Sequence, residues 1–84
     1  MAYNITFKKS VAKDLKKVEK SEVVRILKKI ETELPSKAGQ VPELKGQFAG
    51  LRRLRVGDYR IIFTILGDSV LILRIQHRKE VYRP

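Results

Sequence analysis

The chain has 84 residues, and its 19 Lys and Arg residues against 9 Asp and Glu residues give a formal net charge of +10. This length predicts one domain over residues 1–84, and a hydrophobic content of 43% predicts a folded rather than a disordered chain. The absence of cysteine excludes disulfides, thiolate nucleophiles and cysteine zinc sites. Because small secreted domains usually need disulfides, and we find neither a signal peptide nor a membrane-spanning apolar run, we expect a cytoplasmic protein without membrane contact.

The positive charge is of two kinds along the chain. Residues 1–42 hold nine Lys and one Arg, whereas residues 43–84 hold two Lys and seven Arg. A charge of this size favours an anionic partner, which can be nucleic acid, an acidic membrane surface or an acidic protein. Arginine can bind phosphate through two parallel hydrogen bonds, whereas lysine is a diffuse, well-hydrated charge. We therefore expect a solvated lysine surface in the first half and an anion-binding site in the second.

The first half predicts one strand followed by two helices. Alternation of side chains predicts a strand over 3–8. Apolar residues then recur at helical spacing, which predicts a short helix from Lys9 or Ser10, with Ser10 as its N-cap, and a second helix from Ser21 that Pro35 ends. The two helices form a hairpin. Their predicted buried faces consist of Val11, Leu15 and Val18 in the first helix and of Val23, Val24, Ile26, Leu27, Ile30 and Leu34 in the second.

The second half predicts a loop and a meander of three strands. Residues 35–50 contain prolines and glycines and predict a long loop. Strands are predicted over 51–56, 59–66 and 69–76, joined by Gly-Asp turns and followed by a short polar tail. The order is β-α-α-β-β-β. The predicted class is α+β, with a helical hairpin packed on a small sheet that is mainly antiparallel.

Arginines occur in all three predicted strands of the meander. Alternation puts Arg53 and Arg55 on one face and Arg52 on the other, together with Leu54 and Val56. If Leu54 packs on the helices, Arg53 and Arg55 face solvent. Strict alternation in the last strand places Arg74 on the same face as Val70, Ile72 and Gln76. A single strand arginine can merely protect a sheet edge from aggregation.

The polar tail adds further candidates, namely His77, Arg78, Lys79, Tyr82 and Arg83. Alone, His77 or Tyr82 would more often be structural, but beside several arginines they favour an anion-binding surface. We find no metal-ligand pattern, phosphate loop or nucleophile elbow, and expect no metal or cofactor. RNA cleavage needs none, since the 2′-hydroxyl of the substrate is the nucleophile. The same face without tuned groups would be a plain nucleic-acid-binding or protein-binding surface.

The second half contains three motifs, which are L-x-G-x₃-G-L-x-x-L-R at 44–55, G-D-Y-R-I-I-F at 57–63 and H-R-x-x-V-Y at 77–82. Together they resemble the toxins of the RelE/ParE superfamily, from bacterial and archaeal type II toxin–antitoxin systems. The element order is similar over essentially the whole chain. For the RelE branch, the resemblance implies a ribosome-dependent endoribonuclease that enters the A site, cuts mRNA there and inhibits translation.

The resemblance also implies roles for individual residues. Arg60 and Arg78 would bind and stabilise the scissile phosphate, with an uncertainty of two residues in the match to Arg78. Tyr82 would stack on or orient the substrate nucleotide, or help to move a proton. The remaining expected RNA contacts are Arg52, Arg53, Arg55, Lys79 and Arg83.

One strand departs from the RelE pattern. The best-known RelE enzymes have lysines on the first strand of the meander, one of them proposed as the base, where this chain has Leu51 and Arg53. Arginine holds its proton too firmly to be an ordinary base. Three explanations stay open: His77 or Tyr82 takes part in proton transfer, catalysis is weak, or cleavage depends on the ribosome. Histidine is well suited to proton exchange near neutral pH.

The ParE branch inhibits DNA gyrase and generally lacks the basic residues and tyrosine of the RelE site. The ending at 77–83 therefore favours RelE. A ParE-like gyrase inhibitor and an inactive, antitoxin-binding member are the alternatives. The resemblance further implies a cognate acidic antitoxin of the RelB kind in a hetero-oligomeric complex, with the ribosome and mRNA as the other partners. A groove between a basic hairpin and a basic sheet would suit an acidic amphipathic segment.

Overall fold

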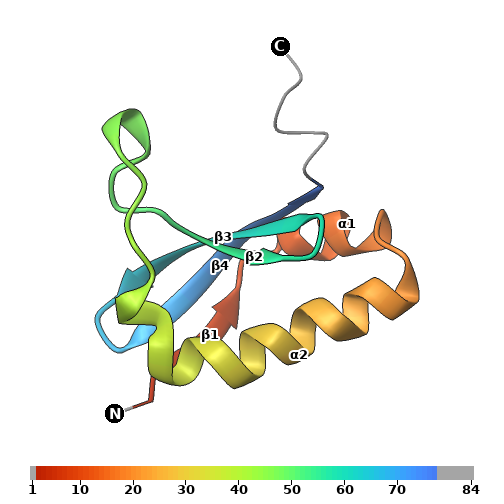
Figure 1. Cartoon of the computed structure of the whole chain (residues 1–84), viewed down its shortest axis with the longest axis horizontal. Helices are drawn as coiled ribbons and strands as arrows, with labels where there is room; N and C mark the ends of the chain where they lie inside the picture. Colours follow the sequence, from red (N-terminus) through yellow and green to blue (C-terminus); the bar gives the residue numbers. More distant parts are fainter. Residues whose placement is uncertain (1, 78–84) are drawn as a thin grey trace.

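Within residues 2–77, the fold is a four-stranded sheet with two helices. The computed structural model describes residues 2–77. The order β-α-α-β-β-β and the α+β class are confirmed, and the predicted bounds of the three meander strands are correct to within one residue. The elements are β1 (Asn4–Phe7), α1 (Ser10–Lys16), α2 (Lys20–Lys37), the 3₁₀ turns η1 (Ala38–Gln40) and η2 (Gly46–Phe48), β2 (Arg52–Val56), β3 (Tyr59–Leu66) and β4 (Ser69–His77) (Figure 1).

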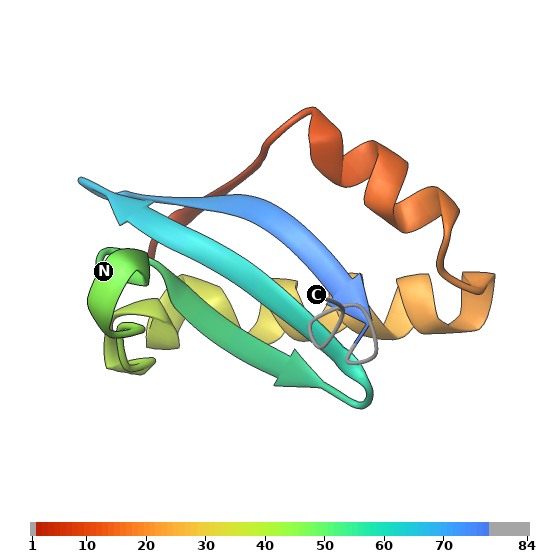
Figure 2. The ribbon, with the colours of Figure 1, turned by 90° about the horizontal axis from the view of Figure 1, so that it is seen from above.

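The strand order in the sheet is β1-β4-β3-β2. β1 pairs in parallel with β4, whereas the β4–β3 and β3–β2 pairs are antiparallel. The helix α2 runs beneath one face of the sheet, and α1 lies beside β4 (Figures 1 and 2). We call the face over α2 the helix-facing side and the opposite face the outer side.

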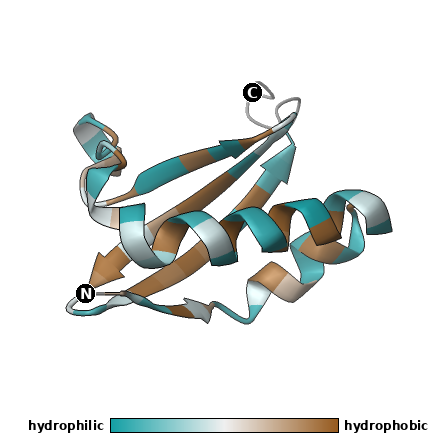
Figure 3. Cartoon of the chain, turned by 60° about the horizontal axis from the view of Figure 1, so that its bottom comes forward, coloured by the Kyte–Doolittle hydropathy of each residue, from teal (hydrophilic) through white to brown (hydrophobic). Residues whose placement is uncertain are grey.

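The core lies between α2 and the helix-facing side of the sheet. Ile26, Ile30 and Leu34 of α2 are fully buried, as are Ile61 and Phe63 of β3. In α2 the outer surface is hydrophilic, and the strands behind it are mainly hydrophobic (Figure 3). The burial of these apolar side chains is the main favourable contribution to folding in a chain of this size.

The predicted buried face of α2 was wrong at Val24, whose exposed fraction is 67%. Ile26, Ile30 and Leu34 follow one another at four-residue steps and set the centre of the buried face. Val24 precedes Ile26 by two residues, or about 200° around the helix axis. It therefore points away from the sheet, although it is as apolar as its neighbours.

The predicted start of α1 at Lys9 or Ser10 is confirmed, but the predicted end of α2 and the predicted N-cap of α1 were wrong. Pro35 lies inside α2, which continues for two further residues. The missing proline N–H affects only the last turn, which the buried Leu34 and Ala38 hold against the sheet, and the Pro35 carbonyl accepts a hydrogen bond from Tyr3 N at 2.8 Å. Ser10 is the first residue of α1 rather than its N-cap, and its Oγ is buried without a hydrogen-bond partner.

The alanine variant of Ile30 should test this core. Ile30→Ala removes a fully buried side chain, and we expect it to lower the free energy of unfolding by about 2–5 kcal/mol because a cavity remains. Val24→Ala, on the exposed side of the same helix, is the control and should change it by about 0.5 kcal/mol or less. Urea denaturation measures both variants. Equal effects would contradict the assigned buried face.

Candidate functional site

Two rows of side chains cross the outer side of the sheet. In one row, Arg53 of β2 pairs with Ile62 of β3, which pairs with Arg74 of β4. In the next row, Arg55 pairs with Arg60, which pairs with Gln76. The residues next to these six along each strand face the helices. Because successive side chains of a strand point to opposite faces of the sheet, the six side chains themselves point to the outer side. We call Arg53, Arg60 and Arg74 the arginine cluster.

Arg74 joins this cluster because β4 is irregular. The pairing of β3 with β4 shifts between Ile62 and Phe63, which face Arg74 and Ile72 respectively, so β4 has one extra residue there. Such a β-bulge reverses the faces of the residues that follow it. The prediction that Arg74 shares a face with Val70 and Ile72 was therefore wrong.

A carboxylate from α1 holds the irregular part of β4. Asp14 Oδ2 accepts hydrogen bonds from Arg74 Nε at 3.1 Å and from Ile75 N at 3.0 Å. β1 pairs with β4 only as far as Ile72. Beyond that point, α1 supplies the hydrogen-bond acceptor for the backbone of β4. Asp14 thus supplies a partner for a part-buried backbone N–H and fixes the arginine beside it. The sequence offered no signal for this pairing, since the two residues lie 60 positions apart.

The arginine cluster borders a hollow of about 440 Å³ on the outer side. Ile62 and Gln76 complete its lining from the sheet. The loop between η1 and β2 closes one side, and its contributing residues are Leu44, Lys45, Phe48 and Leu51. Cations thus surround a partly apolar surface, a combination that suits an anion carrying an apolar group.

Arg52, one of the predicted RNA contacts, lies on the helix-facing side of β2. Its guanidinium donates to the carbonyl of Val41 at 2.5 Å and forms an ion pair of 3.3 Å with Glu43. The structure therefore does not bring it to the arginine cluster. Arg55 is exposed on the edge strand β2, and at this open edge of the sheet it also lines a second hollow, with Arg25 and Lys28 of α2.

His77 also lies apart from the arginine cluster. Its ring contacts that of Tyr59 edge-on, with centroids 5.1 Å apart and an interplanar angle of 85°. Both residues line a hollow with Glu22 and Arg25 of α2, on the helix-facing side. Its neighbour Gln76 points to the outer side, as alternation requires. The structure thus separates the predicted proton carrier from Arg60 by the thickness of the sheet.

The tail residues Arg78, Lys79, Tyr82 and Arg83 lie outside the described residues. Within residues 2–77, no three side chains among His, Cys, Asp and Glu are grouped so as to hold a metal ion. No helix in that part of the chain has the length and apolar character needed to cross a membrane. On α2, hydrogen bonds from Lys29 and Lys37 lower the pKa of Glu33.

The comparisons with known proteins agree on one superfamily. Residues 5–82 match the family model of the ParE toxin of type II toxin–antitoxin systems. The chain is 34% identical over 83 residues to toxin RelE3 of Methanocaldococcus jannaschii, covering 93% of each protein. The chain therefore belongs to the RelE/ParE superfamily of type II toxins, as the motifs predicted.

Solved structures show the same fold. The RelB–RelE antitoxin–toxin complex of Methanococcus jannaschii contains a chain that is 32% identical, with a TM-score of 0.70 and coverage of 94% of this chain and 99% of that one. In the RelBE2 toxin–antitoxin complex of Mycobacterium tuberculosis, the matching chain is 26% identical, with a TM-score of 0.78 and coverage of 93% and 100%. The family model thus has the ParE name, whereas these relatives have RelE names.

Substitutions at Asp14 test how Arg74 is held. Asp14→Ala should lower the free energy of unfolding by about 1–3 kcal/mol, because the part-buried Ile75 N–H loses its acceptor. Asp14→Asn keeps an oxygen for that N–H and should cost less. Urea denaturation measures the stability, and hydrogen exchange of the Ile75 amide reports the local effect. An unchanged exchange rate in Asp14→Ala would contradict this arrangement.

Proposed function

We propose that this protein is a RelE-like toxin, a ribosome-dependent endoribonuclease that cuts mRNA in the A site and so stops translation in the cytoplasm. The observation that carries this proposal is the arginine cluster, three guanidinium groups from three strands that border one hollow. Two of these strands, β2 and β3, contain the motifs of the superfamily. Toxin RelE3 and the toxin of the Methanococcus jannaschii complex are both more than 30% identical to this chain. Both have RelE names, which supports the RelE branch.

The arginine cluster suits a phosphodiester whose negative charge grows during the reaction. In metal-independent RNA cleavage the 2′-hydroxyl gives its proton to a base as its oxygen attacks phosphorus, the P–O5′ bond breaks to leave a 2′,3′-cyclic phosphate, and the departing 5′-oxygen takes up a proton. Arg60, on the inner strand β3, would stabilise the charge on the phosphorus-bound oxygens. Arg53 and Arg74 would bind and orient the backbone on either side. Arg78 and Tyr82 keep the roles that the family resemblance implies, with Lys79 and Arg83 as further RNA contacts.

Proton transfer in this proposal does not need His77. Its ring lies on the helix-facing side against Tyr59, which favours Tyr82 or the ribosome as the source of proton transfer. His77→Ala should therefore cleave mRNA on ribosomes at the rate of the unaltered toxin. A loss of about 100-fold, in a variant that still folds, would return His77 to the catalytic residues.

We further propose that an acidic antitoxin of the RelB kind holds the toxin inactive. Two relatives of known structure, from Mycobacterium tuberculosis and Methanococcus jannaschii, were solved as complexes of toxin with antitoxin. The net charge of +10 favours an acidic partner, whose carboxylates would compete with RNA phosphates for the arginine cluster.

A ParE-like inhibitor of DNA gyrase is the second candidate function, because the matching family model is that of ParE toxins. Pulse-labelling of protein and DNA synthesis after induction separates the two. We expect protein synthesis to stop at once while replication continues. Early arrest of replication with intact translation would contradict the nuclease and support the gyrase inhibitor.

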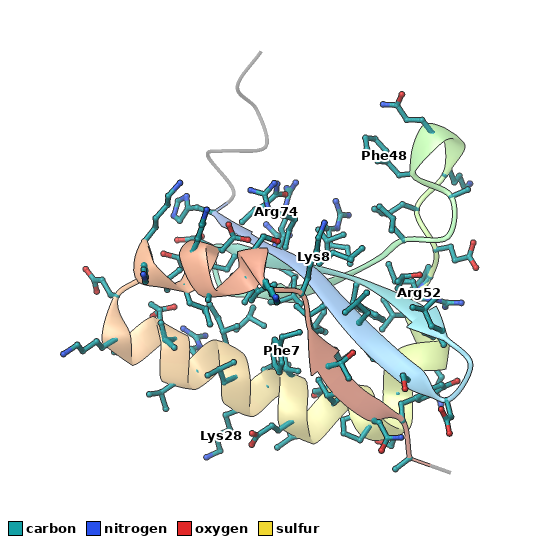
Figure 4. All side chains as sticks on the ribbon, turned by 180° about the vertical axis from the view of Figure 1, so that it is seen from behind. Phe7, Lys8, Lys28, Phe48, Arg52 and Arg74 are labelled. Carbon is teal, nitrogen blue, oxygen red and sulfur yellow. The ribbon has the colours of Figure 1, made fainter. Side chains whose placement is uncertain are left out.

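The central experiment compares two charge-removing variants. Arg60→Ala should reduce ribosome-dependent mRNA cleavage by about 100-fold or more, because a charged donor to the phosphate is lost. Lys28→Ala removes a cation from α2, on the other side of the molecule from Arg74 of the arginine cluster (Figure 4). It should leave the rate of cleavage within about twofold of that of the unaltered toxin. Primer extension on ribosome-bound mRNA measures both, and thermal melting verifies the fold. Equal cleavage by the two variants would overturn the assignment of Arg60.

A further inference from the structure

Phe48 is an exposed aromatic residue that has no part in the core. It lies in η2, at the tip of the loop that rises above the outer side of the sheet (Figures 1 and 4). Its exposed fraction is 51%, so packing explains little of its presence there. Arg74 is on the same side of the sheet, and both residues line the same hollow.

Hydrogen bonds define the shape of the loop that carries Phe48. Leu44 N donates to Leu51 O at 2.8 Å, and Leu51 N donates to Phe48 O at 3.0 Å. Thr64 Oγ1 of β3 donates to Gly50 O at 2.8 Å, which joins the loop to the sheet. Gly50 has a φ of +90°, a conformation that L side chains rarely adopt. The loop therefore has a defined shape and forms one wall of the hollow beside the arginine cluster.

The hollow combines an apolar surface with positively charged groups. Phe48, Leu51 and Ile62 form an apolar part, and Arg53 and Arg60 border it with positive charge. A nucleotide has the matching pair of groups, because its base has an apolar, flat face and its phosphate is an anion one sugar away. Aromatic side chains in single-strand binding sites stack on bases in this way, next to cations that bind the backbone.

We propose that this hollow is a subsite for one unpaired nucleotide, whose base stacks on Phe48 while its phosphate binds Arg60 and Arg53. The inference rests on the proposed function, since it assumes that the outer side of the sheet binds RNA. Half-buried Gln76 pairs with Arg60 across β3 and β4 and also lines the hollow, so its amide can donate a hydrogen bond to the nucleotide beside that arginine. The positive charge and the apolar wall together favour single-stranded RNA, whose bases are accessible, over a duplex.

The subsite can be tested by binding, without ribosomes and without cleavage. The probes are two 2′-O-methyl oligoribonucleotides of equal length, one with all its bases and one abasic throughout. Fluorescence anisotropy should show that the full-length toxin binds the base-carrying probe about tenfold more tightly than the abasic probe. Phe48→Ala should abolish this difference and leave the affinity for the abasic probe unchanged.

Three further variants serve as controls. Phe48→Trp keeps a flat ring and should keep the preference for bases, whereas Phe48→Leu keeps apolar volume without a ring and should lose most of it. Phe7→Ala removes another exposed phenylalanine, 45% exposed on β1, and should have no effect. A preference that survives in Phe48→Ala would overturn the subsite, and so would an equal loss for both probes. If Phe48→Ala weakened the binding of a poly-glutamate peptide but left the binding of both RNA probes unchanged, the subsite would likewise be overturned. The hollow would then be a protein-docking surface instead.

The outcome also separates this inference from the proposed function. Loss of base preference in Phe48→Ala together with absent ribosomal cleavage by the unaltered toxin would support the subsite and overturn the nuclease. Ribosomal cleavage together with an unchanged base preference in Phe48→Ala would support the nuclease and overturn the subsite.

Discussion

The burial of α2 against one face of the sheet determines which side chains remain to meet a partner. Ile26, Ile30 and Leu34 are fully buried against a sheet that offers Ile61 and Phe63 on the same side. Once this face is covered, alternation leaves every second residue of the strands on the outer side. Arg53 and Arg60 are directed outward for this reason, since placing them inward would bury unpaired charge.

The remaining arginine of the cluster depends on a different constraint. β4 has an extra residue at the bulge, which moves Arg74 to the outer side and returns Ile75 to the core. The bulge leaves the Ile75 N–H at a position that β1 does not reach, and Asp14 of α1 accepts from it. The same carboxylate binds Arg74, so α1 both completes the sheet edge and places one side chain of the site.

The charges of the molecule are distributed in a way that separates structural from functional roles. Several basic residues have acidic partners that tie down local structure, as Arg52 does with Glu43 and Lys29 with Glu33. Arg74 shares Asp14 with the backbone, and the described residues that line the hollow are basic, apolar or amide residues. A surface of this composition attracts anions at long range and can bind them at short range. The apolar surface at Phe48 would add a preference for RNA that carries its bases, which positive charge alone would not give.

Local patterns in the sequence determined most of the fold. The alternation along the strands, the Gly-Asp turns and the helical spacing of Ile26, Ile30 and Leu34 are short-range features, so the strands, the helices and the outward position of Arg53 could be predicted. The motifs at 44–55, 57–63 and 77–82 were enough to predict the superfamily. The exposure of Val24 and the continuation of α2 through Pro35 could not be predicted in this way, because packing against the sheet decided both.

Only the tertiary structure decided the composition of the site. Arg74 enters it through a bulge that strict alternation does not foresee, and Arg52 is absent because contacts with Val41 and Glu43 hold it on the other side. His77 was predicted to belong to the site but faces Tyr59 and α2. Phe48 lines the same hollow as the arginines because a hydrogen-bonded loop rises beside the outer side of the sheet. Each of these outcomes depends on contacts between residues distant in the chain, which the periodicity of a single sequence does not encode.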